Sequence, residues 1–492
     1  MILPFIVELT HYSRFTSPEC FIIAAFPAST RKNRTESVNT LARKLRVTDY
    51  FTLGWGTMVG VGWLVVMDDW LGRGGSMGAL LGFAIGGAVL LPIGWVYGKL
   101  VMAMPDAAGE VAYTSAAFSR GISFATGWMM MLAYFIVCPW EAVAVGRIAG
   151  YIVPGLDSLE IYRVAGRPVY LPHLLIGLAL TGLLTVLNYR GIRLSATFQN
   201  WTSFGTLALF IVFVAIGVSR GSPRNFPPLF THSPFVSILL VIQIVPYFMT
   251  GFESVSKAAE EADPDFRGRS FFRAIWMAIF VGILFYTCIV AAVGFVAPWH
   301  ALIREKFMTA VAFQQAVGSR WIVNIILAAA LLSLFKCFNG NFVAASRLVF
   351  ALGRRGLIDA GAGRIHPRHR TPSIAVLCVG AATAACMLLG DAILVPITEV
   401  GSVACAIGWS ATCLACLYLG RAGVRSNRIE LSAMERGIAV FGLLVGIAML
   451  LMKVVPLVPG HFTVYEWLAL GIWIALGAIC GRKKAPGTLT DV

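Results

Sequence analysis

The sequence predicts an all-α polytopic membrane protein. Hydrophobic residues make up 58% of the chain, charged residues only 13%, and the mean hydropathy is +0.79. A soluble globular domain has about 25% charged residues. Apolar runs of about 20 residues, long enough to cross a bilayer, recur along the chain. These observations exclude a set of soluble domains and imply that the lipid bilayer is the main partner.

Twelve apolar segments reach the length of a transmembrane helix. They are expected at 48–70, 78–101, 122–148, 172–189, 201–219, 235–256, 274–297, 321–350, 373–390, 394–419, 435–458 and 463–481. An even number places both termini on one side of the membrane. Most of the 39 Lys and Arg residues fall in the two tails and in the alternate loops on that side. The positive-inside rule therefore predicts cytoplasmic termini in a plasma (inner) membrane protein.

The chain divides into five expected parts. Two cytoplasmic tails, of which the first is expected to be disordered, flank two groups of five helices and a final pair of helices. The ranges are 1–45 for the N-terminal tail, 46–220 for helices 1–5, 221–420 for helices 6–10, 421–481 for helices 11 and 12, and 482–492 for the C-terminal tail. The final pair lies outside the two groups of five, and the sequence does not indicate an oligomeric state.

Charge, cysteine and histidine patterns exclude several classes of protein. The net charge is +15, but no basic patch interleaved with aromatic residues indicates nucleic-acid binding. The ten cysteines lie mostly within predicted helices without a paired pattern, so they are expected to pack as small apolar residues. All seven histidines fall in tails, loops or helix ends. We therefore expect no metal site and no cofactor.

The first predicted helix contains an unusual stretch, FTLGWGTMVGVGWLV (51–65), with four glycines. Its Gly-x-Gly-x-x-x-Gly spacing is close to a dinucleotide-binding fingerprint, but that site needs a strand before the glycines and a helix after them in a soluble unit. Close helix packing is a second interpretation, because glycines four residues apart let helices approach closely. The same spacing occurs in the second helix, at Gly78, Gly82 and Gly86.

A second interruption, in the sixth predicted helix, favours a third interpretation. PYFMTGFESVSKAAEEA (246–262) carries Pro246, Gly251 and the intramembrane Glu253. If helices 1–5 and 6–10 are inverted repeats, the first and sixth helices occupy corresponding positions. Paired interruptions at such positions are typical of the binding site of a secondary transporter.

Two broken helices would expose opposite electrical poles at the middle of the membrane. Amide groups at the start of the outer half-helix, near 61–63, favour a carboxylate. Carbonyl groups at the helix ends near 55–58 and 247–250 favour an ammonium group. Non-helical backbone at this depth is tolerated only where it lines a cavity. The arrangement suits a zwitterion, and free α-amino acids are the expected class of small-molecule substrate.

Several motifs resemble those of permeases of the amino acid–polyamine–organocation superfamily. They are GTMVGVG (56–62), MPDAAGEVAY (104–113), NYRGIRLSA (188–196), GFESVSKAAEEA (251–262) and NGNFVAASRLVFALGRRG (339–356). The resemblance covers roughly residues 45–420. It implies the five-plus-five inverted-repeat fold shared with sodium-coupled leucine transporters, in which helices 1 and 6 are discontinuous.

The resemblance also implies roles for individual residues. The substrate's amino and carboxylate groups would be surrounded by Thr57, Met58, Gly60, Val61 and Gly62. Tyr247 would be an aromatic gate, although an ordinary packing role is the alternative, and Thr250 and Gly251 would lie at the second break. Glu253 would take part in gating. The third helix would supply the side-chain pocket, including Val137 and Cys138.

Two further buried charges, Lys336 and Glu141, lie within predicted helices. Many sodium-independent relatives carry a lysine in the fifth helix in place of a sodium ion, whereas this chain has Thr206 there. Lys336, on the eighth helix, is proposed to replace the ion and to load and release a proton. A structural ion pair between Lys336 and Glu141 is the alternative. Glu141 could instead select a cationic side chain.

These observations predict a secondary active transporter for an amino acid or related amine, working by alternating access. It is expected to be sodium-independent, and either proton-coupled or an exchanger. A polyamine or organic-cation permease and a non-transporting sensor or channel on the same fold remain open. An enzyme is not expected, because the Gly-x-Ser-x-Gly match at 217–221 ends a membrane helix and has neither a preceding strand nor a buried histidine.

Overall fold

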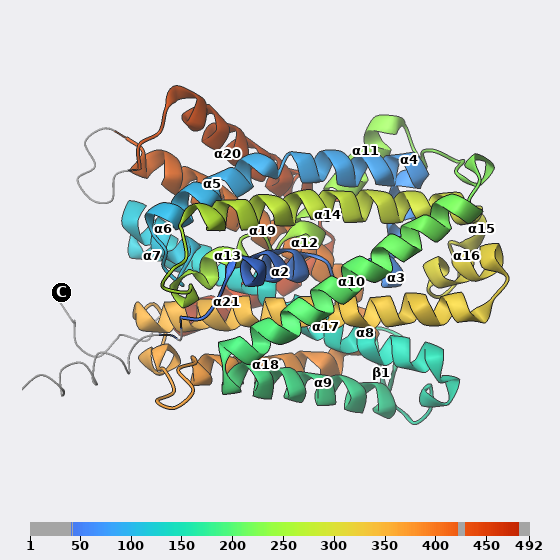
Figure 1. The fold of residues 1–492 in the computed structure, drawn as a ribbon, viewed down its shortest axis with the longest axis horizontal. Coiled ribbons are helices and arrows are strands. Elements are labelled where there is room, and N and C mark those ends of the chain that lie inside the picture. Colours follow the sequence, from blue (N-terminus) through green and yellow to red (C-terminus); the bar gives the residue numbers. More distant parts are fainter. Residues whose placement is uncertain (1–40, 42, 422–428, 482–492) are drawn as a thin grey trace, which may run out of the picture. The chain divides into compact units, whose positions relative to one another are not determined.

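The computed structural model describes residues 41, 43–421 and 429–481, and these are mostly helical (Figure 1). Residues 1–40, 42 and 482–492, which make up nearly all of the two expected tails, lie outside the described residues. The end of the first expected tail is part of the fold. The amides of Lys44 and Leu45 donate to the Glu261 carbonyl at 2.8 and 2.9 Å, and Leu45 forms a parallel bridge with Ala262.

Ten helical segments in the described part of the chain are long and apolar enough to cross a membrane. They are Met67–Ala103, Arg120–Ile152, Leu171–Arg190, Leu194–Arg220, Arg269–Val296, Arg320–Arg354, Ser373–Ala392, Pro396–Leu419, Ala433–Val454 and Val464–Gly481. Each overlaps one of the expected spans. The prediction of a helical integral membrane protein is therefore confirmed.

The other two expected spans, 48–70 and 235–256, are built from short helices. The first consists of α2 (Val47–Met58) and α3 (Gly62–Val65), followed by the start of α4 (Met67–Ala88). The second consists of α11 (Pro234–Ile242), α12 (Val245–Met249) and α13 (Ser254–Lys257). Every residue of α12 and α13 is buried, as are residues 50–58 of α2. The breaks thus lie inside the protein, where neighbouring helices rather than lipid surround the freed backbone groups.

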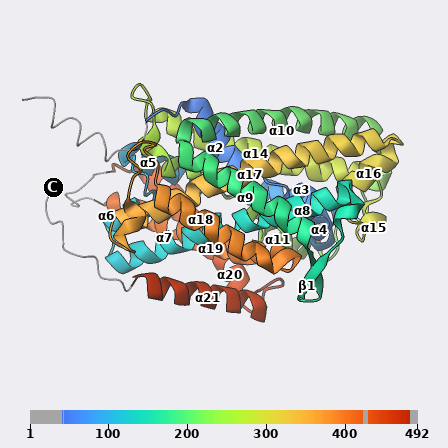
Figure 2. The same cartoon turned by 90° about the horizontal axis from the view of Figure 1, so that it is seen from below.

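Long helices enclose the short ones. Figure 1 shows α2 near the middle of the bundle, and it packs against α10 (Ile192–Arg220), α14 (Arg269–Val296) and α17 (Arg320–Arg354). On another side, α12 packs against α19 (Leu394–Leu419), which also contacts α7 (Arg120–Phe135) and α20 (Ala433–Val454). The final helix, α21 (Val464–Gly481), lies at the edge of the bundle in Figure 2 and buries only three of its residues.

The glycines of the second predicted span have the packing role that their spacing suggests. Gly78, Gly82 and Gly86 on α4 face residues of α11 and α12 that are also four apart, namely Ser237, Val241 and Val245. A Cβ atom at Gly86 would lie 2.7 Å from a methyl group of Val245. The absence of a side chain is therefore what lets the two backbones approach. At Gly75, where φ is +70°, the chain turns from the first expected span into the second.

The remaining helices complete the bundle, and several short elements cover its ends. The helices are α5 (Leu91–Ala103), α6 (Glu110–Ala117), α8 (Val137–Ile152), α9 (Leu171–Arg190), α15 (Trp299–Leu302), α16 (Met308–Val317) and α18 (Ser373–Cys386). An antiparallel hairpin, β1 (Glu160–Val164) and β2 (Arg167–Tyr170), joins α8 to α9. It was not predicted. The 3-10 turn Met387–Ile393, η5, lies against this hairpin.

Candidate functional site

The break after α2 exposes backbone carbonyl groups, and side chains of other helices hydrogen-bond to them. Ser333 Oγ donates to the Val59 and Gly60 carbonyls at 3.1 and 2.7 Å. Asn341 Nδ2 donates to the Thr57 carbonyl at 3.0 Å, and the Tyr286 hydroxyl lies 3.0 Å from the Met58 carbonyl. The sequence predicted free carbonyls at this helix end. The structure corrects that expectation, because the fold supplies its own donors.

Lys336 lies at the carbonyl end of the break. Its side chain is fully buried, and its ammonium group donates to the Val59 carbonyl. The same group lies 4.4 Å from the centre of the Trp55 ring, within range of a cation–π interaction. The amine of Lys336 therefore occupies the place where the helix end favours a cation.

Glu141 lies at the opposite, amide end of the break. Its Oε1 accepts the Val61 amide at 3.3 Å, and its Oε2 has no hydrogen-bond partner among the described residues. Lys336 and Glu141 do not form an ion pair in the described part of the chain, so that alternative is wrong. Each charge instead faces the backbone pole of opposite sign.

The break between α12 and α13 is held by Glu253. Its carboxylate accepts the Thr250 hydroxyl at 2.6 Å, the Gly251 amide at 3.0 Å and the Trp409 indole at 3.3 Å. Three hydrogen bonds to one buried carboxylate fix the non-helical backbone on either side of it. In the geometry seen here, Glu253 supports the second break and does not line the cavity between the two breaks.

Gly251 is the point where the two breaks approach each other. Its φ is +134°, a conformation that side-chain-bearing residues rarely adopt, and a Cβ atom would lie 2.5 Å from the Met58 amide nitrogen. We expect Gly251→Ala to destabilise the protein by about 2 kcal/mol or more, because strained backbone and a backbone clash coincide. Thermal unfolding in detergent measures the effect.

The matched control for Gly251→Ala is Gly182→Ala on α9, where an added Cβ meets nothing within 4 Å. Alanine is favoured over glycine within a helix, so this variant is expected to be neutral or slightly stabilising. Equal unfolding temperatures for the two variants would contradict the role assigned to Gly251.

A small cavity of about 20 Å³ lies between the two broken helices. This volume holds about one water molecule. The cavity is lined by Thr57, Met58, Gly60, Gly62, Val137, Trp140, Glu141, Tyr247, Phe248, Thr250 and Cys337. Besides Glu141 Oε2, the Tyr247 hydroxyl is buried without a hydrogen-bond partner among the described residues. Two polar groups thus remain available beside the cavity.

Most of the proposed substrate-binding residues lie together at this cavity, and three do not line it. Val61 is buried and contributes its amide to Glu141, whereas the Cys138 thiol lies 3.7 Å from the Tyr134 carbonyl of the preceding helical turn. Gly251 packs against the end of α2. Sequence reasoning missed Phe248 and Cys337, each of which is adjacent in sequence to a residue that it identified.

The family model described as amino acid permease matches residues 50–460. The chain belongs to the amino acid permease family. The motif resemblance inferred from the sequence is therefore confirmed.

Three curated relatives illustrate the range of the family. The permease is 26% identical to the branched-chain amino acid permease BcaP of Bacillus subtilis (strain 168) over 381 residues, which is 75% of this chain and 78% of the relative. It is 24% identical to the methylthioribose transporter of the same organism over 341 residues, 68% and 72% of the two chains. It is 27% identical to the gamma-aminobutyric acid permease of Escherichia coli (strain K12) over 318 residues, 61% and 63% of the two chains.

The permease also contains a buried network of charges that sequence reasoning did not identify. Lys257, at the end of α13, forms an ion pair with Glu110 at the start of α6, and both side chains are fully buried. The Tyr134 hydroxyl and the Glu253 carbonyl also accept from Lys257, at 3.0 and 3.1 Å. The Tyr97 hydroxyl donates to Glu110 at 2.5 Å.

A second buried ion pair joins neighbouring segments of the same end of the permease. Arg347 on α17 donates twice to Glu261, at 2.6 and 3.3 Å, and both side chains are almost fully buried. Glu261 is also the residue whose carbonyl binds the chain at 44–45. These contacts therefore join three parts of the chain at this end: residues 44–45, the segment that follows α13, and helix α17. In the sequence, the only indication of these buried ion pairs was the presence of charged residues within the family-like motifs at 104–113, 251–262 and 339–356.

Proposed function

We propose that this permease is a secondary active transporter that moves an amino acid across the membrane by alternating access. The observation that carries the proposal is the cavity between two broken helices, which is lined by Glu141 and Tyr247; Glu141 Oε2 and the Tyr247 hydroxyl have no hydrogen-bond partner in the described part of the chain. A buried polar group without a hydrogen-bond partner destabilises the protein. A ligand that supplies the missing hydrogen bond removes this cost, and its binding is strengthened by the same free energy. The family membership and the names of the relatives agree with this class of substrate.

The substrate's two charged groups would bind neighbouring groups at the amide end of the first break. Its ammonium group would bind Glu141 Oε2, and its carboxylate would bind the amides that begin α3, at Gly62 and Trp63. The first amides of a helix have no partner within the helix and carry partial positive charge. The Tyr247 hydroxyl would hydrogen-bond the substrate and cover it. Because the cavity has a volume of only about 20 Å³, an amino acid enters only if the surrounding helices move apart, as alternating access requires.

The position of Lys336 supports transport without sodium. Its ammonium group occupies the carbonyl end of the α2 break, where a coupling cation would otherwise be favoured. We therefore propose a proton-coupled or exchange mechanism in which Lys336 remains part of the site. Glu253 would act in gating by holding and releasing the second break.

We further propose twelve membrane spans, formed by the ten long segments and the two interrupted ones. In this topology the regions 46–220 and 221–420 are inverted repeats, α20 and α21 follow them, and both termini lie in the cytoplasm. The protein would reside in the plasma membrane. The positive-inside distribution of Lys and Arg and the breaks at corresponding positions support this topology.

Counterflow in proteoliposomes tests transport directly. Vesicles would be loaded with unlabelled L-leucine, L-isoleucine, gamma-aminobutyric acid, L-arginine or putrescine, and uptake of the labelled compound would be measured. We expect internal amino acid to accelerate uptake several-fold. A channel or a non-transporting sensor gives no such acceleration, and acceleration by putrescine alone would favour the polyamine alternative.

The same assay tests Glu141. We expect Glu141→Gln to lower amino acid counterflow about tenfold or more, because a hydrogen bond to a charged group contributes about 1.5–3 kcal/mol. The matched control is Glu160→Gln, which removes an exposed carboxylate from the β1 hairpin. Unchanged counterflow in Glu141→Gln would contradict the proposed binding of the amino group.

A further inference from the structure

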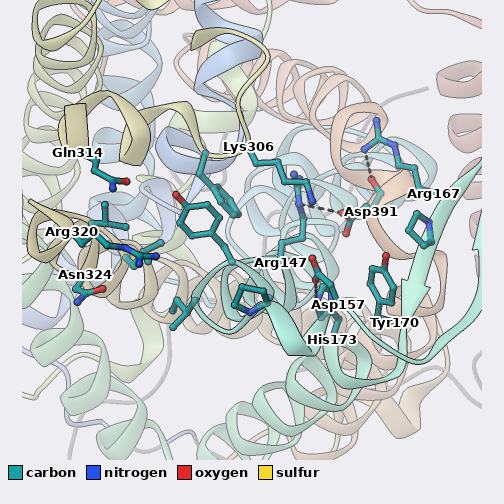
Figure 3. A pocket seen from close by; sticks show the side chains of 18 residues that line it. Arg147, Asp157, Arg167, Tyr170, His173, Lys306, Gln314, Arg320, Asn324 and Asp391 are labelled. Atoms are coloured by element: carbon teal, nitrogen blue, oxygen red, sulfur yellow. Dashed lines mark hydrogen bonds and ion pairs between the residues drawn. The ribbon is translucent and has the colours of Figure 1, made fainter. Parts of the chain in front are cut away.

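A much larger cavity lies beyond the central one, at the end of the bundle that carries the β hairpin. Its volume is about 550 Å³, within the range of small-molecule sites. Figure 3 shows its lining side chains, which come from the end of α8 and the segment after it, β2, the start of α9, the loop before α16, α16 itself, the start of α17 and η5. Residues of this loop and of the hairpin were not singled out by the sequence.

The cavity carries an excess of positive charge. Four cationic side chains line it, Arg147, Arg167, Lys306 and Arg320, against the two carboxylates Asp157 and Asp391. The formal excess is two positive charges with His173 counted as neutral. A concave site lined by charges of one sign concentrates ligands of the opposite sign.

The carboxylates already have partners. Arg147 forms an ion pair with Asp391 at 3.2 Å, Arg167 donates to the Asp391 backbone carbonyl at 3.3 Å, and Asp157 lies 2.9 Å from His173. Lys306 and Arg320 form no ion pair among the described residues, although Lys306 lies close enough to Asp391 for electrostatic attraction. The side chains of Gln314 and Asn324 are grouped with Arg320 in Figure 3, and their amides add hydrogen-bond donors.

Two helices connect this cavity to the central one. Arg147 follows Glu141 by six residues on α8, a rise of about 9 Å. Leu327, which lines the large cavity, precedes Lys336 by nine residues on α17, a rise of about 13.5 Å. A solute that entered between α8 and α17 would therefore pass the cations before it reached Glu141.

We propose that the large cavity binds the carboxylate group of an amino acid through Arg320 before the amino acid enters the central site, and that Lys306 adds to the positive charge of the cavity. The guanidinium of Arg320 matches a carboxylate with two parallel hydrogen bonds. The excess positive charge attracts a carboxylate and repels a polyamine, which has no anionic group. This inference rests on the proposed amino acid transport, and it adds a second site on the route of the substrate.

Protection from an arginine-specific reagent tests the site without measuring transport. The purified full chain is treated with phenylglyoxal in sodium acetate, in L-leucine or in sodium chloride at matched ionic strength, and the modification of each arginine is followed by mass spectrometry. We expect acetate and L-leucine to slow the modification of Arg320 about fivefold relative to chloride. Arg304 is the internal control, because it is exposed on the same loop as Lys306 and does not line the cavity. Equal rates in the three solutions, or equal protection of Arg304, would overturn the proposal.

Transport kinetics of Lys306→Gln/Arg320→Gln provide the second measurement. We expect the KM for the amino acid that shows counterflow to rise about tenfold at low ionic strength with little change in the maximum rate, and the difference to shrink as salt screens the charges. Arg304→Gln should behave as the wild type. An unchanged KM overturns the proposal. If the wild type shows no amino acid counterflow but acetate still protects Arg320, the proposed function fails and the carboxylate site stands.

Discussion

Replacement of Lys336 with methionine is expected to abolish counterflow and leave the protein folded. Methionine keeps an unbranched apolar chain in the same buried space, so packing against Trp55 should survive. The variant lacks the charge that donates to the Val59 carbonyl, although Ser333 still donates to that carbonyl at 3.1 Å. We therefore expect a small change in unfolding temperature and a loss of transport of at least tenfold. The loss follows from a charge-assisted hydrogen bond of about 1.5–3 kcal/mol at the break that we propose as the substrate-binding site.

The control for Lys336→Met is Lys99→Met, which breaks a partly exposed ion pair with Glu435 on another part of the bundle. A partly exposed pair contributes about 0–1 kcal/mol, so this variant should transport at the wild-type rate. Wild-type counterflow should also be the same in sodium and choline buffers. Strict sodium dependence, or full activity in Lys336→Met, would rule out the role proposed for the lysine.

The helices could be predicted because lipid imposes a simple requirement on sequence. A segment that crosses the hydrocarbon region must be apolar for about 20 residues, and this pattern is visible without any knowledge of tertiary contacts. The interruption at FTLGWGTMVGVGWLV was visible for a related reason, since four glycines weaken a helix wherever they pack. The structure places the end of α2 at Met58, within this stretch.

The partners of the broken backbone could not be predicted, because they come from distant parts of the sequence. The two donors to the Val59 carbonyl, Ser333 and Lys336, are 274 and 277 residues away, and Glu141 is 80 residues from Val61. Periodicity identifies which residues are buried but not which pairs meet. The alternative of a Lys336–Glu141 ion pair failed for this reason, because each of the two side chains binds a nearer backbone group.

The β hairpin shows a local signal that was overlooked. Two residues, Ala165 and Gly166, connect its strands with φ values of +47° and +77°. Positive φ at both central residues is typical of the type I′ turn, which suits a two-residue hairpin loop. The flanking Tyr-Arg-Val and Arg-Pro-Val-Tyr favour strands, but the segment lies between two strongly apolar helices and was read only as a loop.

Separating Lys257 from Glu110 is expected to cause the largest loss of stability. Both side chains are fully buried, and removal of one partner leaves the other charge unpaired away from water. Such a change costs about 3–5 kcal/mol. We therefore expect Lys257→Met and Glu110→Gln each to lower the unfolding temperature markedly. The double variant should regain most of the loss, because it contains neither buried charge.

A double-mutant cycle separates this interaction from general damage to the core. The coupling energy is the change in unfolding free energy of the double variant minus the sum of the changes in the two single variants. It should be large for residues in direct contact. The exposed pair Arg163–Glu160 provides the control cycle, in which no coupling should be measurable. Wild-type stability in Lys257→Met would show that the buried pair contributes nothing. The ion pair joins the start of α6 to the end of α13, just beyond the second break. If the double variant is stable but its counterflow is lost, the pair also sets how often the protein opens at this end of the bundle.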